Sequence, residues 1–165
     1  MHNEGSGFTL VELLVVIAII GIFFLSITQI FFGVIRSQSQ SEITKDVKQQ
    51  GDYAFSVMES MIRNAKDVTY PSCGGSDTAL TITNPDNGAT TFDCGGSQIA
   101  SNSSSLTSTN VAVSNCTFVV NPNPCPAGAP KYVYINFTIK QANAAAGVGE
   151  SATQTYQGTV SLRTY

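Results

Sequence analysis

A single carboxylate, Glu12, lies in the otherwise apolar sequence GFTLVELLVVIAIIGI of residues 7–22. A charge at the centre of a membrane-spanning helix costs about 2.5–3.5 kcal/mol on insertion scales. The chemistry open to a carboxylate in apolar surroundings is pairing with a cation, because buried charges are normally paired. Glu12 is therefore the first candidate functional residue of this chain.

The four cysteines, Cys73, Cys94, Cys116 and Cys125, all follow the apolar segment. None forms a CxxC pair, and the only histidine, His2, is distant in sequence, which argues against a zinc site. Two disulfides in an oxidising compartment are expected instead. Four cysteines allow three pairings, and we favour Cys73–Cys94 with Cys116–Cys125 because each pair closes a local loop.

The other polar residues form no catalytic motif. Because the only histidine precedes the apolar segment, no Ser-His-Asp arrangement is expected in the rest of the chain. Asp77, Asp86 and Asp93 are acids in predicted loops. They lack the spacing of an EF-hand, and calcium requires six to eight oxygen ligands. We expect no enzymatic activity, no metal site and no cofactor, with calcium as the alternative.

Basic residues are few and scattered, and the net charge is −3 at pH 7. A protein that binds the nucleic-acid backbone presents a cluster or stripe of Lys and Arg. No direct nucleic-acid partner is therefore expected.

The apolar segment is long enough to span a membrane. No charged residue occurs from Leu13 to Ile35, and a helix of this length extends about 34 Å, against about 30 Å for the hydrocarbon core. A secretory signal peptide fits poorly because the preceding MHNEGSG lacks Lys and Arg and no A-x-A-like cleavage site follows. A plain single-span anchor explains the length but leaves Glu12 without a function.

The sequence GFTLVELLVVIAIIGI resembles the N-terminal signature of type IV pilins and type II secretion pseudopilins, which is a Gly, an aromatic residue, Thr-Leu-Val-Glu and a long apolar helix. The resemblance implies that prepilin peptidase cuts between Gly7 and Phe8. It also implies that Phe8 becomes the N-methylated N-terminus. By the same resemblance, Phe8, Thr9 and Glu12 take part in filament assembly.

Cleavage would give Glu12 a natural partner, because the new α-amine at Phe8 has an ordinary pKa near 7.7. Opposite charges about 4 Å apart attract by about 4 kcal/mol at an effective dielectric constant near 20, which is comparable to the insertion penalty. In the family this pair forms between subunits. An intramolecular contact of Phe8 with Glu12, one turn away, is the alternative, and Thr9 adds a hydroxyl to the same polar cluster.

Beyond the apolar segment the sequence predicts an α+β protein. Apolar residues spaced three and four apart predict that the helix runs on from about Phe8 to about Val68. Strand patterns follow at 79–83, 90–94, 111–120, 131–140 and 156–165, with a mobile loop at 141–154. The helix is expected to pack on an antiparallel sheet of four to six strands, a pilin fold, through Ile43, Val47, Ala54, Met58, Met61, Ile62 and Ala65.

The predicted organisation has four parts. They are a prepilin leader (1–7), a transmembrane and filament-core helix (8–35), its amphipathic continuation (36–68) and a β-rich headgroup (69–165). The order of elements in the headgroup looks like that of minor J-type pseudopilins and W-type minor pilins.

These patterns predict a structural subunit of a type IV pilus-like or type II secretion filament, specifically a minor, priming or tip-proximal subunit. A major pilin for adhesion, motility or DNA uptake is one alternative, and a monomeric membrane-tethered surface binding module is another. The expected partners are other pilin or pseudopilin subunits, prepilin peptidase, the inner-membrane assembly platform and, before assembly, membrane lipid. The expected location is the cytoplasmic or inner membrane, with one span and an extracytoplasmic headgroup, followed by an extracellular or periplasmic filament.

Overall fold

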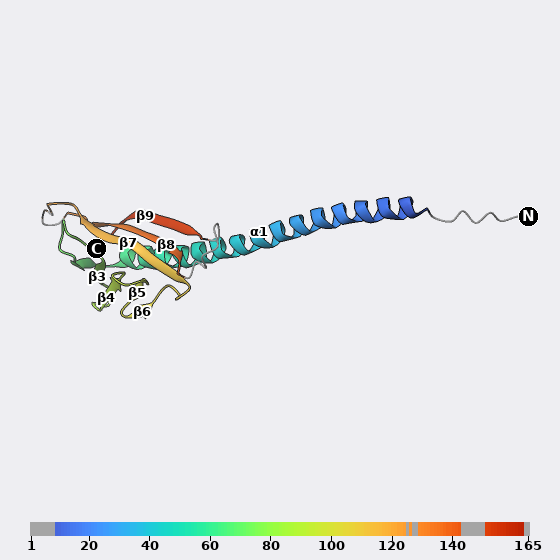
Figure 1. Cartoon of the computed structure of the whole chain (residues 1–165). Coiled ribbons are helices and arrows are strands. Elements are labelled where there is room, and N and C mark those ends of the chain that lie inside the picture. Colours follow the sequence, from blue (N-terminus) through green and yellow to red (C-terminus); the bar gives the residue numbers. More distant parts are fainter. Residues whose placement is uncertain (1–8, 125, 127–128, 143–150, 164–165) are drawn as a thin grey trace, which may run out of the picture. The chain divides into compact units, whose positions relative to one another are not determined.

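The computed structural model describes residues 9–124, 126, 129–142 and 151–163. Within these residues one helix is followed by nine strands (Figure 1). The elements are α1 (Leu10–Asn64), β1 (Asp67–Tyr70), β2 (Ser76–Asp77), β3 (Ala79–Thr83), β4 (Ala89–Asp93), β5 (Ala100–Ser101), β6 (Ser104–Ser105), β7 (Val111–Asn121), β8 (Tyr132–Gln141) and β9 (Thr153–Ser161). The chain divides into two compact units, Met1–Ser39 and Gln40–Tyr165, so that α1 contributes to both.

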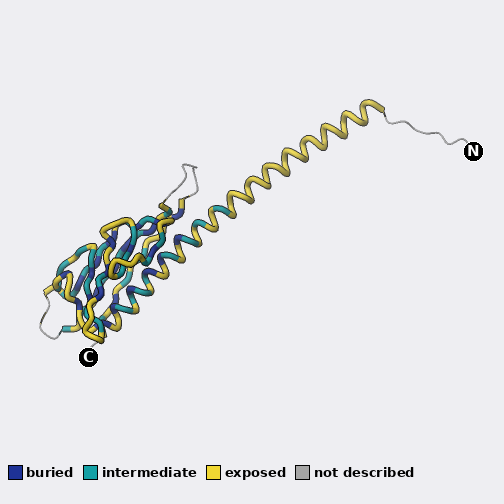
Figure 2. The backbone as a smooth tube through the Cα atoms, turned by 90° about the horizontal axis from the view of Figure 1, so that it is seen from below, coloured by how far each residue is buried: buried dark blue, intermediate teal, exposed yellow. Residues whose placement is uncertain are grey.

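In the first unit, α1 is mostly apolar from Leu10 to Ile35, and this stretch is exposed on every side (Figure 2). Leu10 is 77 % exposed and Phe24 is 72 % exposed. Two hydroxyl side chains within this apolar stretch, Ser26 and Thr28, donate to backbone carbonyls four residues earlier at 3.0 and 2.8 Å. By length and composition, α1 is the one helix of the described residues that qualifies as a membrane span.

The part of α1 in the second unit is amphipathic. Its buried residues recur every three or four positions, as one face of a helix requires. They are Val47, Gly51, Ala54, Met58 and Ile62. The predicted packing face is thus confirmed, since Ala65 is also buried and Ile43 and Met61 pack against the core.

The helix ends at Asn64, four residues before the predicted end at Val68. Beyond this point the backbone pairs with β3 instead: Lys66 N donates to Thr83 O at 2.8 Å, and Val68 lies opposite Ile82. The prediction for residues 65–68 was wrong because a long-range strand pairing replaces the last helical turn.

The headgroup contains two antiparallel sheets, whereas one was predicted. Their strand orders are β1-β3-β4-β5-β6 and β2-β7-β8-β9. All five predicted strands are present, and β3 has the predicted bounds. β1 and the two-residue strands β2, β5 and β6 were not predicted from the sequence. The predicted mobile loop at 141–154 lies mostly outside the described residues.

Both sheets and α1 share one hydrophobic core. Alternate residues of β8 point into it, and Val133, Ile135, Phe137 and Ile139 are all 0 % exposed. The same core contains Leu80, Ile82 and Phe92 of the five-stranded sheet and Phe118 and Val120 of β7. The α+β class predicted from sequence is confirmed.

A disulfide between Cys94 and Cys116 links the two sheets. Cys94 follows β4 and Cys116 lies in β7, with their Cα atoms 6.1 Å apart. Both predicted pairs, Cys73–Cys94 and Cys116–Cys125, were therefore wrong, because the packing of the sheets selects the partners rather than the loop length. Cys73 is also disulfide-bonded, and Cys125 lies outside the described residues.

Tyr156 of β9 lies against the α1 backbone at Gly51. A Cβ atom at Gly51 would overlap the Tyr156 ring, so a glycine is needed for this close approach. The Tyr156 hydroxyl donates to the carbonyl of Lys48 at 3.0 Å. Its ring stacks on Phe137 and Phe55, with centroid distances of 5.1 and 6.2 Å. These contacts fix α1 on the four-stranded sheet.

The contact at Tyr156 predicts a loss of stability in alkali. Burial, followed by the neighbouring Asp52 carboxylate, raises the pKa of Tyr156 to about 12, compared with about 10 in an unfolded chain. Between these pH values the folded protein keeps a proton that the unfolded protein has lost, so the free energy of unfolding falls as the pH rises from 10 to 12. Chemical denaturation at several pH values, compared with Tyr156→Phe, measures this effect. A variant with the same pH dependence as the unmodified protein would contradict the assignment.

Candidate functional site

The N-terminus of α1 is closed by a reciprocal pair of hydrogen bonds between Thr9 and Glu12. Glu12 N donates to Thr9 Oγ1 at 3.3 Å, and Thr9 N donates to Glu12 Oε2 at 3.1 Å. This is a capping box, in which the residue before the helix and the third helical residue satisfy each other's backbone N–H groups. Leu13 N then donates to Thr9 O, the first bond of the helical ladder.

Only one of the two carboxylate oxygens of Glu12 accepts hydrogen bonds within the described residues. Thr9 Oγ1 also donates to Glu12 Oε2, at 2.9 Å, so both Thr9 donors go to the same oxygen. Within the described residues, Glu12 Oε1 receives no hydrogen bond. The cap therefore holds the side chain in place and leaves one oxygen for a further donor.

Of the residues predicted to take part in processing and assembly, the structure describes Thr9 and Glu12. Thr9 and Glu12 are brought together, as the expected polar cluster requires. Gly7 and Phe8 lie outside the described residues, so cleavage and N-methylation there stay predictions. The capping box was not predicted from the sequence, although Thr9-Leu10-Val11-Glu12 carries its S/T-x-x-E signature before an apolar run.

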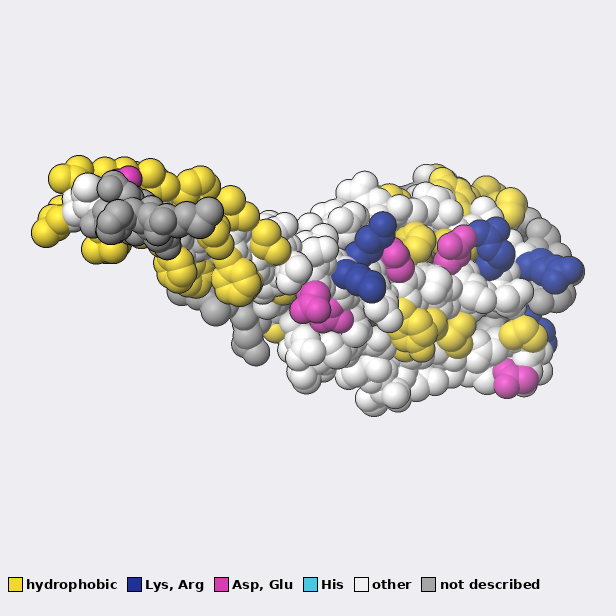
Figure 3. Space-filling view, turned by 90° about the vertical axis from the view of Figure 1, so that its right-hand side faces the viewer, with side chains coloured by type: hydrophobic (Ala, Val, Ile, Leu, Met, Phe, Trp, Pro, Cys, Tyr) yellow, Lys and Arg dark blue, Asp and Glu magenta, His cyan; other side chains and the backbone are white. Residues whose placement is uncertain are grey.

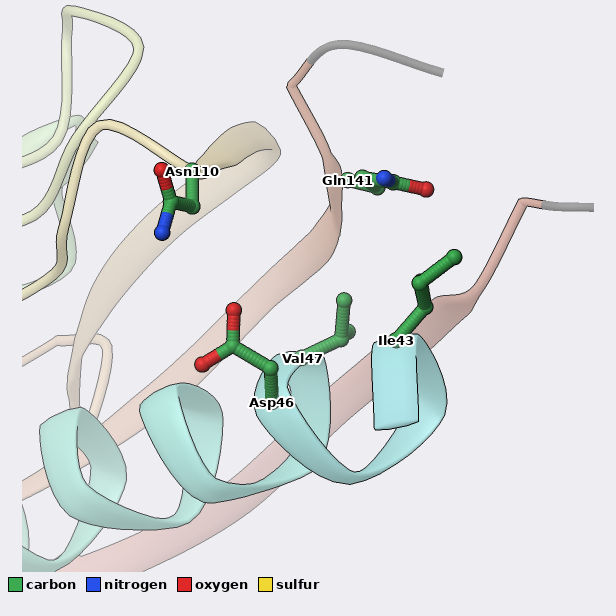
Figure 4. A pocket seen from close by; sticks show the side chains of 5 residues that line it. All are labelled: Ile43, Asp46, Val47, Asn110 and Gln141. Atoms are coloured by element: carbon green, nitrogen blue, oxygen red, sulfur yellow. The ribbon is translucent and has the colours of Figure 1, made fainter. Parts of the chain in front are cut away.

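The headgroup contains a pocket of about 180 Å³ (Figure 4). Ile43, Asp46 and Val47 of α1 line one side, and Asn110 and Gln141 line the other. Asp46 is the only titratable side chain among these lining residues. The lining therefore contains neither a nucleophile paired with a general base nor two carboxylates, which are common catalytic arrangements. Gln141 Oε1 is buried and has no hydrogen-bond partner among the described residues, but its amide points away from Asp46 in Figure 4.

Two contacts of charged side chains in the headgroup involve acidic residues near β1 and β2. Lys131 Nζ lies 2.5 Å from Asp67 Oδ1. The Tyr70 hydroxyl donates to Asp77, which lowers the pKa of that carboxyl and raises the pKa of the Tyr70 hydroxyl. No group of three or more His, Cys, Asp or Glu side chains suited to a metal occurs in the described part of the chain.

On the face of the molecule seen in Figure 3, the N-terminal helix and the headgroup differ in the types of side chain that they expose. Apolar side chains gather over the N-terminal helix, whereas on the headgroup small apolar areas, basic residues and acidic residues are interspersed among uncharged surface. No large patch of one charge is present on this face. The distinctive surface of the chain is therefore the exposed apolar helix that starts at the Thr9–Glu12 cap.

Residues 5–28 match the family model described as the prokaryotic N-terminal methylation motif. The matched segment contains the predicted cleavage position, the Thr9–Glu12 cap and most of the exposed apolar helix. No curated protein and no solved structure matches the chain.

The class supported by this motif is that of the type IV pilins and pseudopilins. The long N-terminal helix packed on antiparallel sheets is a pilin-like arrangement. The motif points to a structural subunit and implies processing by prepilin peptidase and assembly with other pilin subunits. Together with the apolar helix it suggests a single-pass membrane anchor.

Proposed function

We propose that this protein is a minor subunit, in a priming or tip-proximal position, of a type IV pilus-like or type II secretion filament. The observation that carries the proposal is the match of residues 5–28 to the methylation motif, with the capped Glu12 at the start of the exposed apolar helix. The sequential order of one long helix, short strands and three long strands supports the minor role through its likeness to J-type pseudopilins and W-type minor pilins.

The exposed side chains of α1 need an apolar environment. Nearly every large residue from Leu10 to Ile35 is apolar and about half or more exposed. Burying apolar surface is favourable by about 25 cal/mol per Å² relative to water, and lipid satisfies this need before assembly. In the filament, helices of neighbouring subunits replace the lipid, so removal from the membrane does not expose this surface to water.

Glu12 then selects the position of one subunit relative to the next. The α-amine created at Phe8 of one subunit is the cation that pairs with Glu12 of another. The Thr9 cap supports this mechanism because it orients the carboxylate and leaves Oε1 for the incoming ammonium. Helix offsets that separate the two charges leave both of them in an apolar medium, which is costly.

Processing of the N-terminus tests the proposal directly. Expression with prepilin peptidase, followed by mass spectrometry of the N-terminal peptide, is expected to show a chain that begins with methylated Phe8. Replacing Gly7 by Val is expected to block the cut, because a bulky side chain would occupy the position next to the cleaved bond. The readout is an unshifted precursor band on a gel.

Gly5→Val is the matched control, since it adds the same side chain two residues before the cleavage position and should be processed. An intact leader in cells that contain the peptidase would contradict the proposed function. The abundance of the subunit in sheared filaments then separates the two filament roles: a minor subunit is a small fraction of the protein, whereas a major pilin dominates it.

A further inference from the structure

The apolar part of α1 carries a regular seam along one side. Its residues alternate in steps of four and three, the spacing that keeps one face of a helix against a parallel partner in a left-handed coiled coil. All of these residues are exposed. They are Val11, Val15, Ala18, Ile22, Leu25, Gln29, Phe32 and Arg36.

Gln29 is the one uncharged polar residue on this seam. The nearby Ser26 and Thr28 hydroxyls are satisfied by backbone carbonyls of α1. By contrast, the Gln29 amide has no hydrogen-bond partner in the described part of the chain, and its two neighbours on the seam are Leu25 and Phe32. In lipid a polar side chain of this kind is costly and faces another helix rather than the hydrocarbon.

The surface around Gln29 is hollowed. A groove of about 480 Å³ is lined by Leu25, Thr28, Gln29, Phe32, Gly33 and Arg36. Gly33 has no atom within 4 Å of the position a Cβ would take, so a neighbouring helix can approach closely there. The long side chain of Arg36, at the end of the seam, can place its charge in the interface with water.

We propose that this seam pairs with the same seam of a second copy of the chain while both are in the membrane, before assembly. The inference rests on the proposed function, because it requires α1 to span the membrane. Two copies inserted by the same route have the same direction and depth, so Gln29 of one copy meets Gln29 of the other. A primary amide is both donor and acceptor and can therefore bond to its own copy. A single polar residue on such a seam also fixes the register of the pair.

Cysteine cross-linking of the full-length chain in phosphatidylcholine vesicles tests the proposal. Leu25→Cys places a thiol on the seam, and Ile27→Cys places one on the opposite side of the helix. Oxidation is expected to give several-fold more disulfide-linked dimer for Leu25→Cys. Adding Gln29→Leu to Leu25→Cys should lower the dimer yield about threefold, as expected for one interhelical hydrogen bond in a membrane. Gln29→Asn keeps an amide and should restore part of the yield.

The chain without an added cysteine is the control for cross-linking through the native cysteines. Equal dimer yields at the two positions, or no effect of Gln29→Leu, would overturn the proposal. Dimers seen only in cells with sibling subunits, and never in vesicles that hold this chain alone, would also overturn it by pointing to a different partner. Failure here with normal processing at Phe8 leaves the filament function intact, whereas an uncut leader contradicts that function itself.

Discussion

Replacing Glu12 by alanine is expected to lower the yield of filaments at least about tenfold while the amount of membrane-inserted subunit stays the same. The attraction between Glu12 and the Phe8 α-amine of a neighbouring subunit, about 4 kcal/mol at close range, would be lost, and tenfold corresponds to only about 1.4 kcal/mol. Insertion is preserved because alanine carries no charge into the lipid. Sheared filaments quantified by immunoblot and electron microscopy, together with membrane fractionation, measure both quantities.

Thr9→Val separates the pairing from the capping effect of Glu12. Valine removes the Thr9 hydroxyl but keeps the backbone N–H that donates to Glu12, so the cap is weakened by about 1 kcal/mol. A smaller loss of filaments than in Glu12→Ala is expected, because the carboxylate remains for the α-amine. Wild-type filament numbers in Glu12→Ala would refute the charge-pairing mechanism.

Removing the Cys94–Cys116 disulfide is expected to cost the headgroup about 3 kcal/mol of unfolding free energy. The bridge spans 22 positions of sequence, and the loop-entropy relation gives this value for a loop of that size. For a domain of this length the melting temperature should fall by roughly 10 °C. Thermal unfolding of the double variant Cys94→Ala and Cys116→Ala in detergent, followed by near-ultraviolet circular dichroism, measures the change.

Ser104→Ala is a suitable comparison for the cysteine variant. It removes one polar atom from the exposed strand β6, and exposed substitutions of this kind change stability by at most about 0.5 kcal/mol. If the double cysteine variant melts at the same temperature as this control, the bridge between the sheets does not stabilise the headgroup.

Periodic signals in the sequence were sufficient for the larger elements. The spacing of Val47, Ala54, Met58 and Ile62 predicted the packing face of α1, and alternation along 131–140 predicted β8 with a shift of one residue. Two-residue strands contain no period to detect, which is why β2, β5 and β6 were missed. The helix end was missed because residues 65–68 have an apolar spacing that suits a helix, yet the partner strand β3 takes their backbone hydrogen bonds.

The packing functions of two glycines could not be predicted from the sequence, because they depend on contacts between segments that are distant in the chain. Gly51 and Gly158 belong to α1 and β9, far apart in the chain. Gly51 admits the Tyr156 ring, and a Cβ at Gly158 would lie 2.5 Å from the Phe55 ring. Gly51 is therefore a packing position that only the docking of α1 on the sheet creates.

The sequence by itself determined the candidate site and the class of fold. Glu12, its Thr9 cap and the apolar run after it are all contained in one stretch of chain, and a helix converts that spacing directly into position. Only the tertiary structure decided the division into two sheets, the Cys94–Cys116 pairing and the contact of Tyr156 with Gly51. The reason is that these features join segments distant in sequence, and their geometry is set by how α1 and both sheets pack around one core.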